Sequence, residues 1–169
     1  RVEDRRLLIG AGRYTEDIAP GQGLHVAFSR APYAHAHLLN IDLEAARQMD
    51  GVHLVATQAD LDADHIGDVL CQYRPPLIGG GIMQLVSKPA MVRDINRHAG
   101  DIVAMVVADR QEIAHAAIEL ITAEFEPMPA VTDIYEAMKD GAPQLYNCYP
   151  NNIAFEWGAG KLDETERAM

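Results

Sequence analysis

The sequence predicts a mixed α/β domain, and three observations support this fold class. Short apolar runs with a period of two indicate several strands. Elsewhere apolar residues recur at helical spacing, most clearly at Ile113, Ala114, Ala117 and Ile118. Twice along the chain a predicted strand is followed by a predicted helix and then by another strand. We therefore expect an α+β or α/β arrangement with two strand–helix–strand units.

The longer of these units spans residues 100–131 and organises the rest of the chain. Residues 102–108 form a continuous apolar run with three valines, which is typical of a strand covered on both faces. Asp109 is the predicted N-cap of the following helix, because Glu112 stands three residues later as in a capping box. A strand over residues 121–126 completes the unit, and we expect a right-handed crossover between its two strands.

The same pattern assigns side chains to faces. The helix is expected to turn three polar residues toward water: Glu112, His115 and Glu119. In the strand that follows, alternate residues point in opposite directions. We expect one face to carry Ile121, Ala123 and Phe125, and the other to carry Thr122, Glu124 and Glu126.

The remaining elements are shorter. Residues 24–30 alternate as a half-buried strand, with Leu24, Val26 and Phe28 on the apolar face. The shorter strand–helix–strand unit consists of a strand at 36–42, a helix at 43–49 and a strand at 52–57, which allows its two strands to run parallel.

The second half of the chain adds three elements around irregular segments. Residues 58–87 are expected to be loop, apart from a helical turn at 59–61. A short helix is predicted at 133–139 and a final strand at 153–157. The polar segment from residue 162 onward resembles the opening of a further element.

Composition limits the classes of function. The chain has 169 residues, of which 49% are hydrophobic, and this suits one domain with or without an appendage. Its net charge of −11 disfavours nucleic acids and anionic lipid as partners. We expect neither a membrane span nor a secretory leader. The first residue is not methionine and the last lies in a polar segment, so we expect a piece of a longer protein.

The cysteine content indicates the compartment. Cys71 and Cys148 are the two cysteines, too few for a four-thiolate iron–sulfur or zinc site. One disulfide would satisfy the count, but we expect both thiols to be reduced in a cytoplasmic protein.

One histidine pair suggests a metal site. His35 and His37 are two residues apart on a predicted strand and therefore share a face, as zinc ligands can. The sequence shows no evident third ligand, since His25 or His53 would approach only if the strands happened to align. The competing interpretation is that both are surface or interface histidines.

Other candidate motifs have ordinary explanations. The carboxylates of Glu124 and Glu126 are expected to be solvated charges on a strand face. Residues 10–12 (Gly-Ala-Gly) lack the strand and the third glycine of a dinucleotide fingerprint, and residues 79–81 (Gly-Gly-Gly) lack the lysine of a phosphate loop. No serine or cysteine has the context of a nucleophile. We therefore predict no catalytic, cofactor-binding or metal-binding residue in this chain.

Several collinear blocks, however, resemble a known family. They are RVEDRRLLIGAGRYTEDI, LHVAFSRAPYAHAHLLNID, DGVHLVATQADL and HAGDIVAMVVADRQEIAHAAIELITAEFEPMPAVTD. Together with the closing NNIAFEWGAG they resemble the amino-terminal α/β hammerhead domain of the molybdenum hydroxylase large subunit, the family of xanthine dehydrogenase, aldehyde oxidase and aerobic carbon monoxide dehydrogenase. The chain departs from the family pattern at residues 100–104, which lack a proline, at Tyr33 and His37, and around residues 79–81.

The resemblance implies an organisation and a role. Residues 1–22 would be an N-terminal arm, 23–145 the hammerhead domain and 146–169 a segment leading toward molybdopterin-binding domains. The full-length protein would carry a molybdenum–pterin cofactor outside this chain, with [2Fe-2S] clusters and FAD on partner subunits or domains. This part would be a scaffold for the cofactor domains and the substrate approach, inactive alone. The alternative is a free-standing hammerhead module that binds a partner without catalysis.

Overall fold

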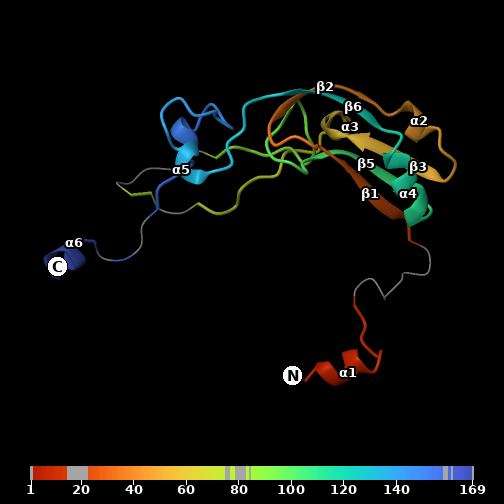
Figure 1. The fold of residues 1–169 in the computed structure, drawn as a ribbon, viewed down its shortest axis with the longest axis horizontal. Helices are drawn as coiled ribbons and strands as arrows, with labels where there is room; N and C mark the ends of the chain where they lie inside the picture. Colours follow the sequence, from red (N-terminus) through yellow and green to blue (C-terminus); the bar gives the residue numbers. More distant parts are fainter. Residues whose placement is uncertain are drawn as a thin grey trace.

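The computed structural model describes residues 2–14, 23–74, 77–78, 83, 85–157, 160 and 162–168. The six strands are β1 (His25–Arg30), β2 (Ala36–Asp42), β3 (Val52–Thr57), β4 (Ile95–Asn96), β5 (Ile102–Ala108) and β6 (Thr122–Pro127). The helices are α1 (Asp4–Leu8), α2 (Glu44–Arg47), α3 (Gln58–Ala63), α4 (Gln111–Ile118), α5 (Ile134–Ala137), a 3-10 turn η2 (Pro150–Asn152) and α6 (Leu162–Ala168). The strands gather at one end of the molecule and α5 lies toward the other (Figure 1). The Gly79–Gly81 loop falls outside the described residues.

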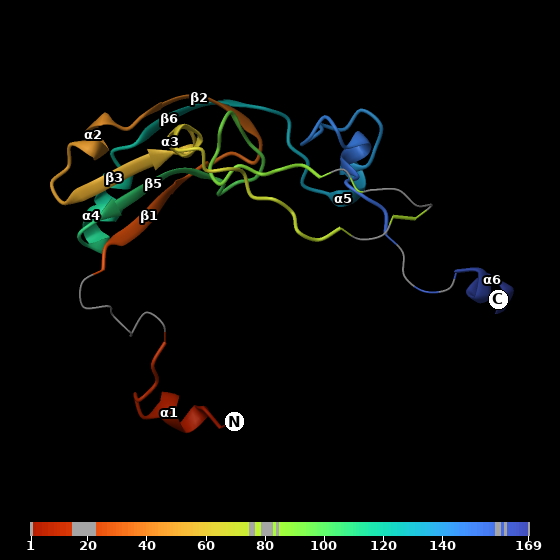
Figure 2. The same cartoon turned by 180° about the vertical axis from the view of Figure 1, so that it is seen from behind.

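The strands form two small antiparallel sheets, one in the order β1-β5-β3 and one in the order β4-β2-β6. The mixed α/β class is confirmed, but the right-handed crossover expected in the longer unit and the parallel pair allowed in the shorter unit do not form. In both units the two strands belong to different sheets, because the intervening helix carries the chain from one sheet to the other (Figure 2). Each strand then finds antiparallel partners that are distant in sequence.

The main core lies between the β1-β5-β3 sheet and helices α4 and α2. Ala104, Val106 and Ala108 of the central strand β5 face Ala114 and Ala117 of α4, and all five are fully buried. The helix can approach the sheet closely because small side chains line both surfaces. The predicted apolar stripe of α4 is thereby confirmed, and Glu112, His115 and Glu119 are exposed as expected.

A second, smaller cluster joins the two sheets. Val103 of β5 packs with Ala31 and Val92, and side chains of β2 and β6 cover them, including Leu38 and Phe125. β5 therefore contributes to both clusters, which agrees with a strand covered on both faces.

The buried face of β1 is not the apolar face that the sequence predicts. Ala27 is buried at 4% exposure, whereas Val26 and Phe28 are 42% and 40% exposed and Leu24 is exposed as well. The reason is the close approach of α4, since the position opposite Val106 has room for an alanine. The larger apolar side chains consequently lie on the outer face of the sheet.

The predicted cap of α4 is also wrong. Arg110 occupies the N-cap position without a side-chain cap, because the Asp109 carboxylate bonds His53 Nε2 at 2.6 Å instead. A capping box is present at α3, where Thr57 and Asp60 exchange hydrogen bonds. This box extends the expected helical turn at 59–61 into a full α3.

Toward the C-terminus the predictions are partly confirmed. The helix predicted at 133–139 is present as the shorter α5, and Asp133 is its N-cap, accepting hydrogen bonds from the backbone N–H groups of Tyr135 and Glu136. The expected strand at 153–157 is wrong, because η2 precedes it and Trp157 makes one bridge, to Leu77. The polar segment after residue 161 does open another element, α6. Among the described residues, none of the helices has the length and apolar character required to cross a bilayer.

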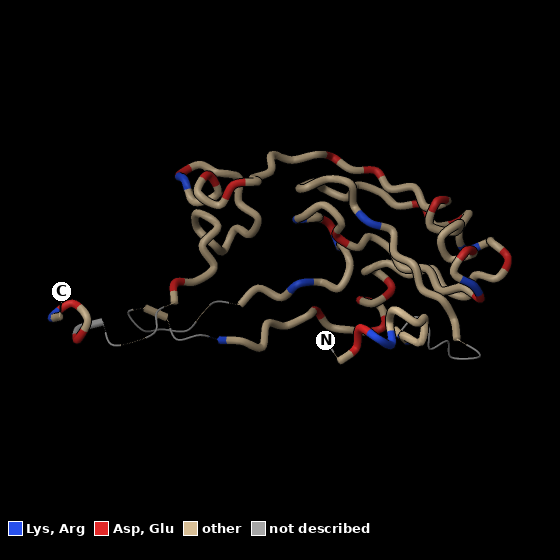
Figure 3. The backbone as a smooth tube through the Cα atoms, turned by 60° about the horizontal axis from the view of Figure 1, so that its bottom comes forward, with Lys and Arg blue, Asp and Glu red and all other residues tan. Residues whose placement is uncertain are grey.

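Charge is distributed unevenly over this fold. The strands of the β1-β5-β3 sheet contain no Asp or Glu, and their single cation is Arg30, at the end of β1. The acidic residues lie instead on turns and irregular segments, on helices, and on strands β2 and β6 of the other sheet (Figure 3). The two sheets therefore differ in charge: β6 of the second sheet exposes Glu124 and Glu126, as predicted.

Candidate functional site

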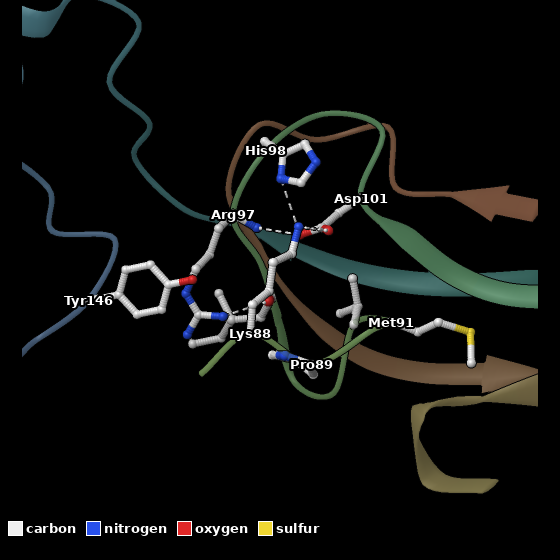
Figure 4. A pocket seen from close by; sticks show the side chains of 9 residues that line it. Lys88, Pro89, Met91, Arg97, His98, Asp101 and Tyr146 are labelled. Carbon is white, nitrogen blue, oxygen red and sulfur yellow. Dashed lines mark hydrogen bonds and ion pairs between the residues drawn. The ribbon is translucent and has the colours of Figure 1, made fainter. Parts of the chain in front are cut away.

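One group of polar side chains surrounds Asp101, at the turn between β4 and β5. Its nearly buried carboxylate lies 3.4 Å from Lys88 Nζ and 3.5 Å from His98 Nδ1. The backbone N–H of Arg97 donates to it at 3.2 Å. Figure 4 shows these groups converging on the carboxylate from two segments of the chain. The negative charge is therefore compensated from several sides, as burial of a carboxylate requires.

The turn itself explains the position of Asp101. Gly100 has a φ of +88°, which only glycine adopts without strain, and its N–H donates to the Ala31 carbonyl. The Ala31 N–H in turn donates to the Asp101 carbonyl at 2.8 Å. These two bonds fasten the turn to the end of β1 and direct the carboxylate toward Lys88.

Arg97 links this turn to a segment fifty residues further along. Its Nε donates to the Leu145 carbonyl at 2.9 Å, and Nη1 donates to the Ile95 carbonyl at 3.2 Å. The guanidinium lies over the Tyr146 ring, 4.5 Å from the ring centroid, which is cation–π geometry. Arg97 thus holds residues 145–146 against β4.

The pocket beside Asp101 has a volume of about 70 Å³. Small-molecule sites have volumes of about 300–1,000 Å³. Its lining includes Lys88 and His98, but both lie within 3.5 Å of the Asp101 carboxylate. We interpret the group of Lys88, Arg97, His98, Asp101 and Tyr146 as a polar junction between chain segments, and we call it the Asp101 junction.

A second polar network joins α3 to the segment before β4. Arg93 donates to both carboxylate oxygens of Asp62, at 2.8 and 2.9 Å, and to Asp68 at 2.9 Å. The hydrogen bonds from Arg93 lower the pKa of Asp62 to about 2, and a bond from Gln58 acts in the same direction. The pKa of Asp68 is lowered for the same reason, with Ser87 as the second donor. The network fixes both ends of the irregular segment between α3 and β4.

The histidine pair lies at the start of β2, with His35 in the bend before the strand and His37 on the strand itself. His35 and His37 line the same open pocket of about 520 Å³, together with Arg97 and Cys148. His35 is buried, and its Nδ1 donates to the Pro129 carbonyl at 2.9 Å. Glu126 is the cross-strand partner of His37. His35 consequently fastens the turn before β2 to the end of β6.

The other histidines do not complete a metal site. His53 lies on β3 and bonds Asp109, and His25 lies on β1. Both therefore belong to the β1-β5-β3 sheet, whereas His37 belongs to the β4-β2-β6 sheet. Within the described part of the chain, no three His, Cys, Asp or Glu side chains come together in a way that could hold a metal ion. The hypothesis of a zinc site built on His35 and His37 lacks the third ligand that it needs.

Sequence reasoning missed the Asp101 junction. Its members are far apart in the chain and share no recognised motif, so spacing alone did not bring them together. One available signal was the Gly100-Asp101 pair, which stands directly before the most apolar strand. An acidic residue after a turn glycine and next to a buried strand needs a cationic partner nearby.

Comparison with known proteins adds a family. Residues 9–129 match the model described as "Aldehyde oxidase and xanthine dehydrogenase, a/b hammerhead domain". This match includes both sheets, α2, α3 and α4. It therefore covers the whole core and the Asp101 turn.

Relatives match almost the entire chain. The large subunit of nicotine 6-hydroxylase from Paenarthrobacter nicotinovorans is 34% identical over 97% of this chain, and the large chain of carbon monoxide dehydrogenase from Hydrogenophaga pseudoflava is 31% identical over the same share. The crystal structure of quinoline 2-oxidoreductase from Pseudomonas putida 86 superposes with a TM-score of 0.74 at 37% identity, covering 88% of this chain and 18% of that one. The chain spans about a fifth of the length of these curated relatives.

Proposed function

The chain belongs to the aldehyde oxidase and xanthine dehydrogenase a/b hammerhead family, and we propose that it acts as the structural domain of a molybdenum-dependent oxidoreductase large subunit. In this role it supports the cofactor-binding domains and shapes the approach of substrate. Residues 1–22 form the arm, 23–145 the hammerhead domain and 146–169 the segment that leads toward the molybdopterin-binding domains.

The observation that carries this proposal is the pattern of coverage. Two large subunits of oxidoreductases match 97% of the chain, yet the match takes up a fifth of their own length. A related protein from Escherichia coli O157:H7 is named the molybdenum-binding subunit of xanthine dehydrogenase, and it is matched over 87% of this chain. The matched region corresponds to one domain that those subunits share. The remaining four-fifths of each subunit has no counterpart in this chain.

The described residues do not fit the cofactor itself. They contain no group of three metal-ligating side chains, and the Asp101 junction encloses about 70 Å³, less than a small-molecule site. We propose that a molybdenum–pterin cofactor is bound by chain outside these residues. When bound there, it would supply the redox chemistry, and [2Fe-2S] and FAD groups on partner subunits or domains would receive the electrons.

The residues of this chain would then act by holding segments in place. Arg97 fastens Leu145 and Tyr146 to β4, at the point where the segment that we assign to the connection begins. Asp101 and Gly100 fix the turn from which Arg97 projects. A rigid origin for the connecting segment is what a scaffold of cofactor domains requires.

We also propose a cytoplasmic location. Cys71 and Cys148 are unpaired and exposed in the structure. Exposed thiols of this kind are kept reduced in the cytosol.

The test is a metal analysis of two polypeptides. One is the 169-residue chain, and the other is the product of its complete reading frame, expressed with the partner genes. We expect stoichiometric molybdenum and dehydrogenase activity with an artificial electron acceptor in the longer product and neither in the shorter one. Stoichiometric molybdenum on the 169-residue chain alone, or none on the longer product, would contradict the proposal.

A further inference from the structure

The open pocket beside the histidine pair is large enough for a small molecule. Its volume is about 520 Å³, within the range of about 300–1,000 Å³ that small-molecule sites occupy. One wall consists of residues at the start of β2 and just after β6, and the other wall is the segment 144–148. Arg97 lies between them, and we call this hollow the Arg97 pocket.

Hydrogen bonds fix both walls of the pocket. On one side, the Met128 N–H donates to the His35 carbonyl at 2.9 Å, and His35 Nδ1 donates to the Pro129 carbonyl. On the other side, Asn152 Oδ1 accepts from the Leu145 N–H at 2.9 Å, and Asn152 Nδ2 donates to two further backbone carbonyls. The pocket is therefore formed before any ligand binds, as most small-molecule sites are.

The lining carries a positive charge that no acidic residue balances. None of the described residues that line the pocket is Asp or Glu, although the chain holds 25 acidic residues among 169. Arg97 is half-buried, and its guanidinium contacts two backbone carbonyls and the Tyr146 ring, all of them uncharged. A cation in such surroundings is stabilised when an anion binds beside it.

The Arg97 guanidinium also has donors to spare. Nε donates to the Leu145 carbonyl, and Nη1 uses one of its N–H groups on the Ile95 carbonyl. Nη2 and the other N–H of Nη1 have no partner among the described residues. These two nitrogens form the end of the planar fork, which matches the two oxygens of one carboxylate. The Tyr146 ring lies against the guanidinium and holds the fork in position (Figure 4).

We propose that the Arg97 pocket binds a small organic carboxylate, whose carboxylate group is held by the free end of the guanidinium. The apolar body of the ligand lies against Ile95, Met128 and Leu145, which are half-buried side chains of the lining. An inorganic anion would leave this apolar surface uncovered, so the lining favours an organic ligand over phosphate or sulfate. Glu126 is the cross-strand partner of His37, and for this reason the anion is assigned to Arg97 and not to His37. The inference is independent of the proposed function.

The two cysteines provide an internal test with benzoate as the probe. Both are exposed, but Cys148 lines the pocket and Cys71 does not. Iodoacetamide is a neutral reagent, and mass spectrometry of the two cysteine peptides gives both alkylation rates. At ten times its Kd, benzoate should slow the alkylation of Cys148 about tenfold, because the occupied pocket shields the thiol. The rate at Cys71 should not change, and an unchanged rate at Cys148 would overturn the proposal.

The measurement is made on the 169-residue chain and on the product of the complete reading frame. We expect benzoate to protect Cys148 in both polypeptides, whether or not the longer one contains molybdenum. If Cys148 of the longer product resists alkylation without benzoate, other parts of the protein cover the pocket and the inference is wrong.

Two further ligands define the chemistry of the site. Benzamide has the shape of benzoate without the charge, and at constant ionic strength its affinity should be at least about tenfold lower. Sulfate should protect Cys148 less than benzoate does at equal concentration. Equal affinity for benzamide and benzoate would refute the role of the guanidinium, and equal protection by sulfate would refute the preference for an organic ligand.

Variants separate binding from folding. Arg97→Gln should lower the affinity for benzoate about tenfold. Asn147→Asp should also weaken binding, because it places a carboxylate at the exposed rim of the pocket. Asn147→Asp keeps every contact of Arg97, so it is decisive even if Arg97→Gln loosens the segment 144–148. The matched control is Gln111→Glu, which adds the same charge at an exposed position of α4 outside the pocket and should bind benzoate like wild type. Wild-type affinity in Asn147→Asp, or an equal loss in Gln111→Glu, would contradict the proposal.

Discussion

Arg93 and Asp62 form a bidentate pair, with Nε 2.9 Å from Oδ2 and Nη2 2.8 Å from Oδ1. This fork geometry is the strong form of the arginine–carboxylate interaction. It joins α3 to the chain that enters β4, across the irregular segment between them. The hydrogen bonds raise the pKa of Arg93 and lower the pKa of Asp62 to about 2.

The pair predicts an acid-sensitive part of the stability. Asp62 has a pKa of about 2 in the folded chain, below the ordinary aspartate pKa of 3.8. Because the folded pKa is the lower one, its contribution is fully present above pH 3.8 and is lost as the pH falls through about 2. Urea denaturation of Asp62→Asn should show a lower midpoint than wild type at pH 7, and the difference should shrink toward pH 2.

The control is Asp64→Asn, at the end of the same helix, whose carboxylate forms no ion pair with any described residue. Its midpoint should follow wild type throughout. A constant difference between Asp62→Asn and wild type from pH 7 to pH 2 would contradict the assignment. The group is exposed to solvent, so the effect should also decrease in high salt.

Gln58 is 1% exposed and is expected to be the most sensitive polar side chain of this region. Its Oε1 accepts from the buried Met91 N–H at 2.9 Å, and its Nε2 donates to Asp62. Gln58→Ala leaves that N–H without a partner, which costs about 1–3 kcal/mol. Equilibrium urea unfolding measures the loss. Gln48→Ala, at the exposed C-cap of α2, should cost less than about 0.5 kcal/mol, and equal losses would refute the role of Gln58.

A side chain at Gly51 is predicted to destabilise the fold. Its φ is +83°, and an added Cβ would lie 2.9 Å from Ile113 Cδ1 and 3.2 Å from Asp109 Oδ2. Gly51→Ala should therefore destabilise the fold by about 1–3 kcal/mol in thermal or urea unfolding. Gly100→Ala has the same positive φ with open space around it and isolates the backbone contribution. Gly67→Ala has neither constraint and should cost nothing; a loss there as large as at Gly51 would reject this explanation.

Arg97→Ala should loosen one segment without unfolding the core. The variant loses the hydrogen bond to the Leu145 carbonyl and the contact with Tyr146. A charged hydrogen bond contributes about 1.5–3 kcal/mol, so amide exchange at residues 145–148 should accelerate about tenfold or more. The β5 amides should keep their wild-type rates. Arg97→Lys retains the charge but not the planar fork, and full rescue by it would show that geometry is unimportant.

The sequence predicts the elements of this fold better than their partners. Five of the six strands and the apolar stripe of α4 follow from periodicity, which is a local property. Strand pairing is not local, because β5 pairs with β1 and β3, which are distant from it in the sequence. The periodicity of a short stretch contains no information about such partners. The two strand–helix–strand units therefore suggested parallel pairs, where the structure builds two antiparallel sheets.

Two errors have specific physical causes. In β1 the alternation was correct but the buried face was not, since α4 approaches so closely that Ala27 rather than Val26 fits beneath it. At α4 the N-cap was assigned to Asp109, whose carboxylate is taken by His53 from another strand. The Asp101 junction was missed for a related reason, because Lys88 and His98 meet it only after folding. Each case involves a tertiary contact that overrides a local preference.

The antiparallel pairing has a consequence for synthesis of the protein. Strand β1 pairs with β5, and β3 also pairs with β5, so neither has a partner until residue 108 has been made. At about 5–20 residues per second, roughly 4–16 seconds separate the completion of β1 from that of β5. During this interval the nascent chain exposes Val26, Phe28 and Leu54 on unpaired strands. Unpaired strands with exposed apolar side chains are prone to aggregate, so the growing polypeptide is most vulnerable before β5 is complete.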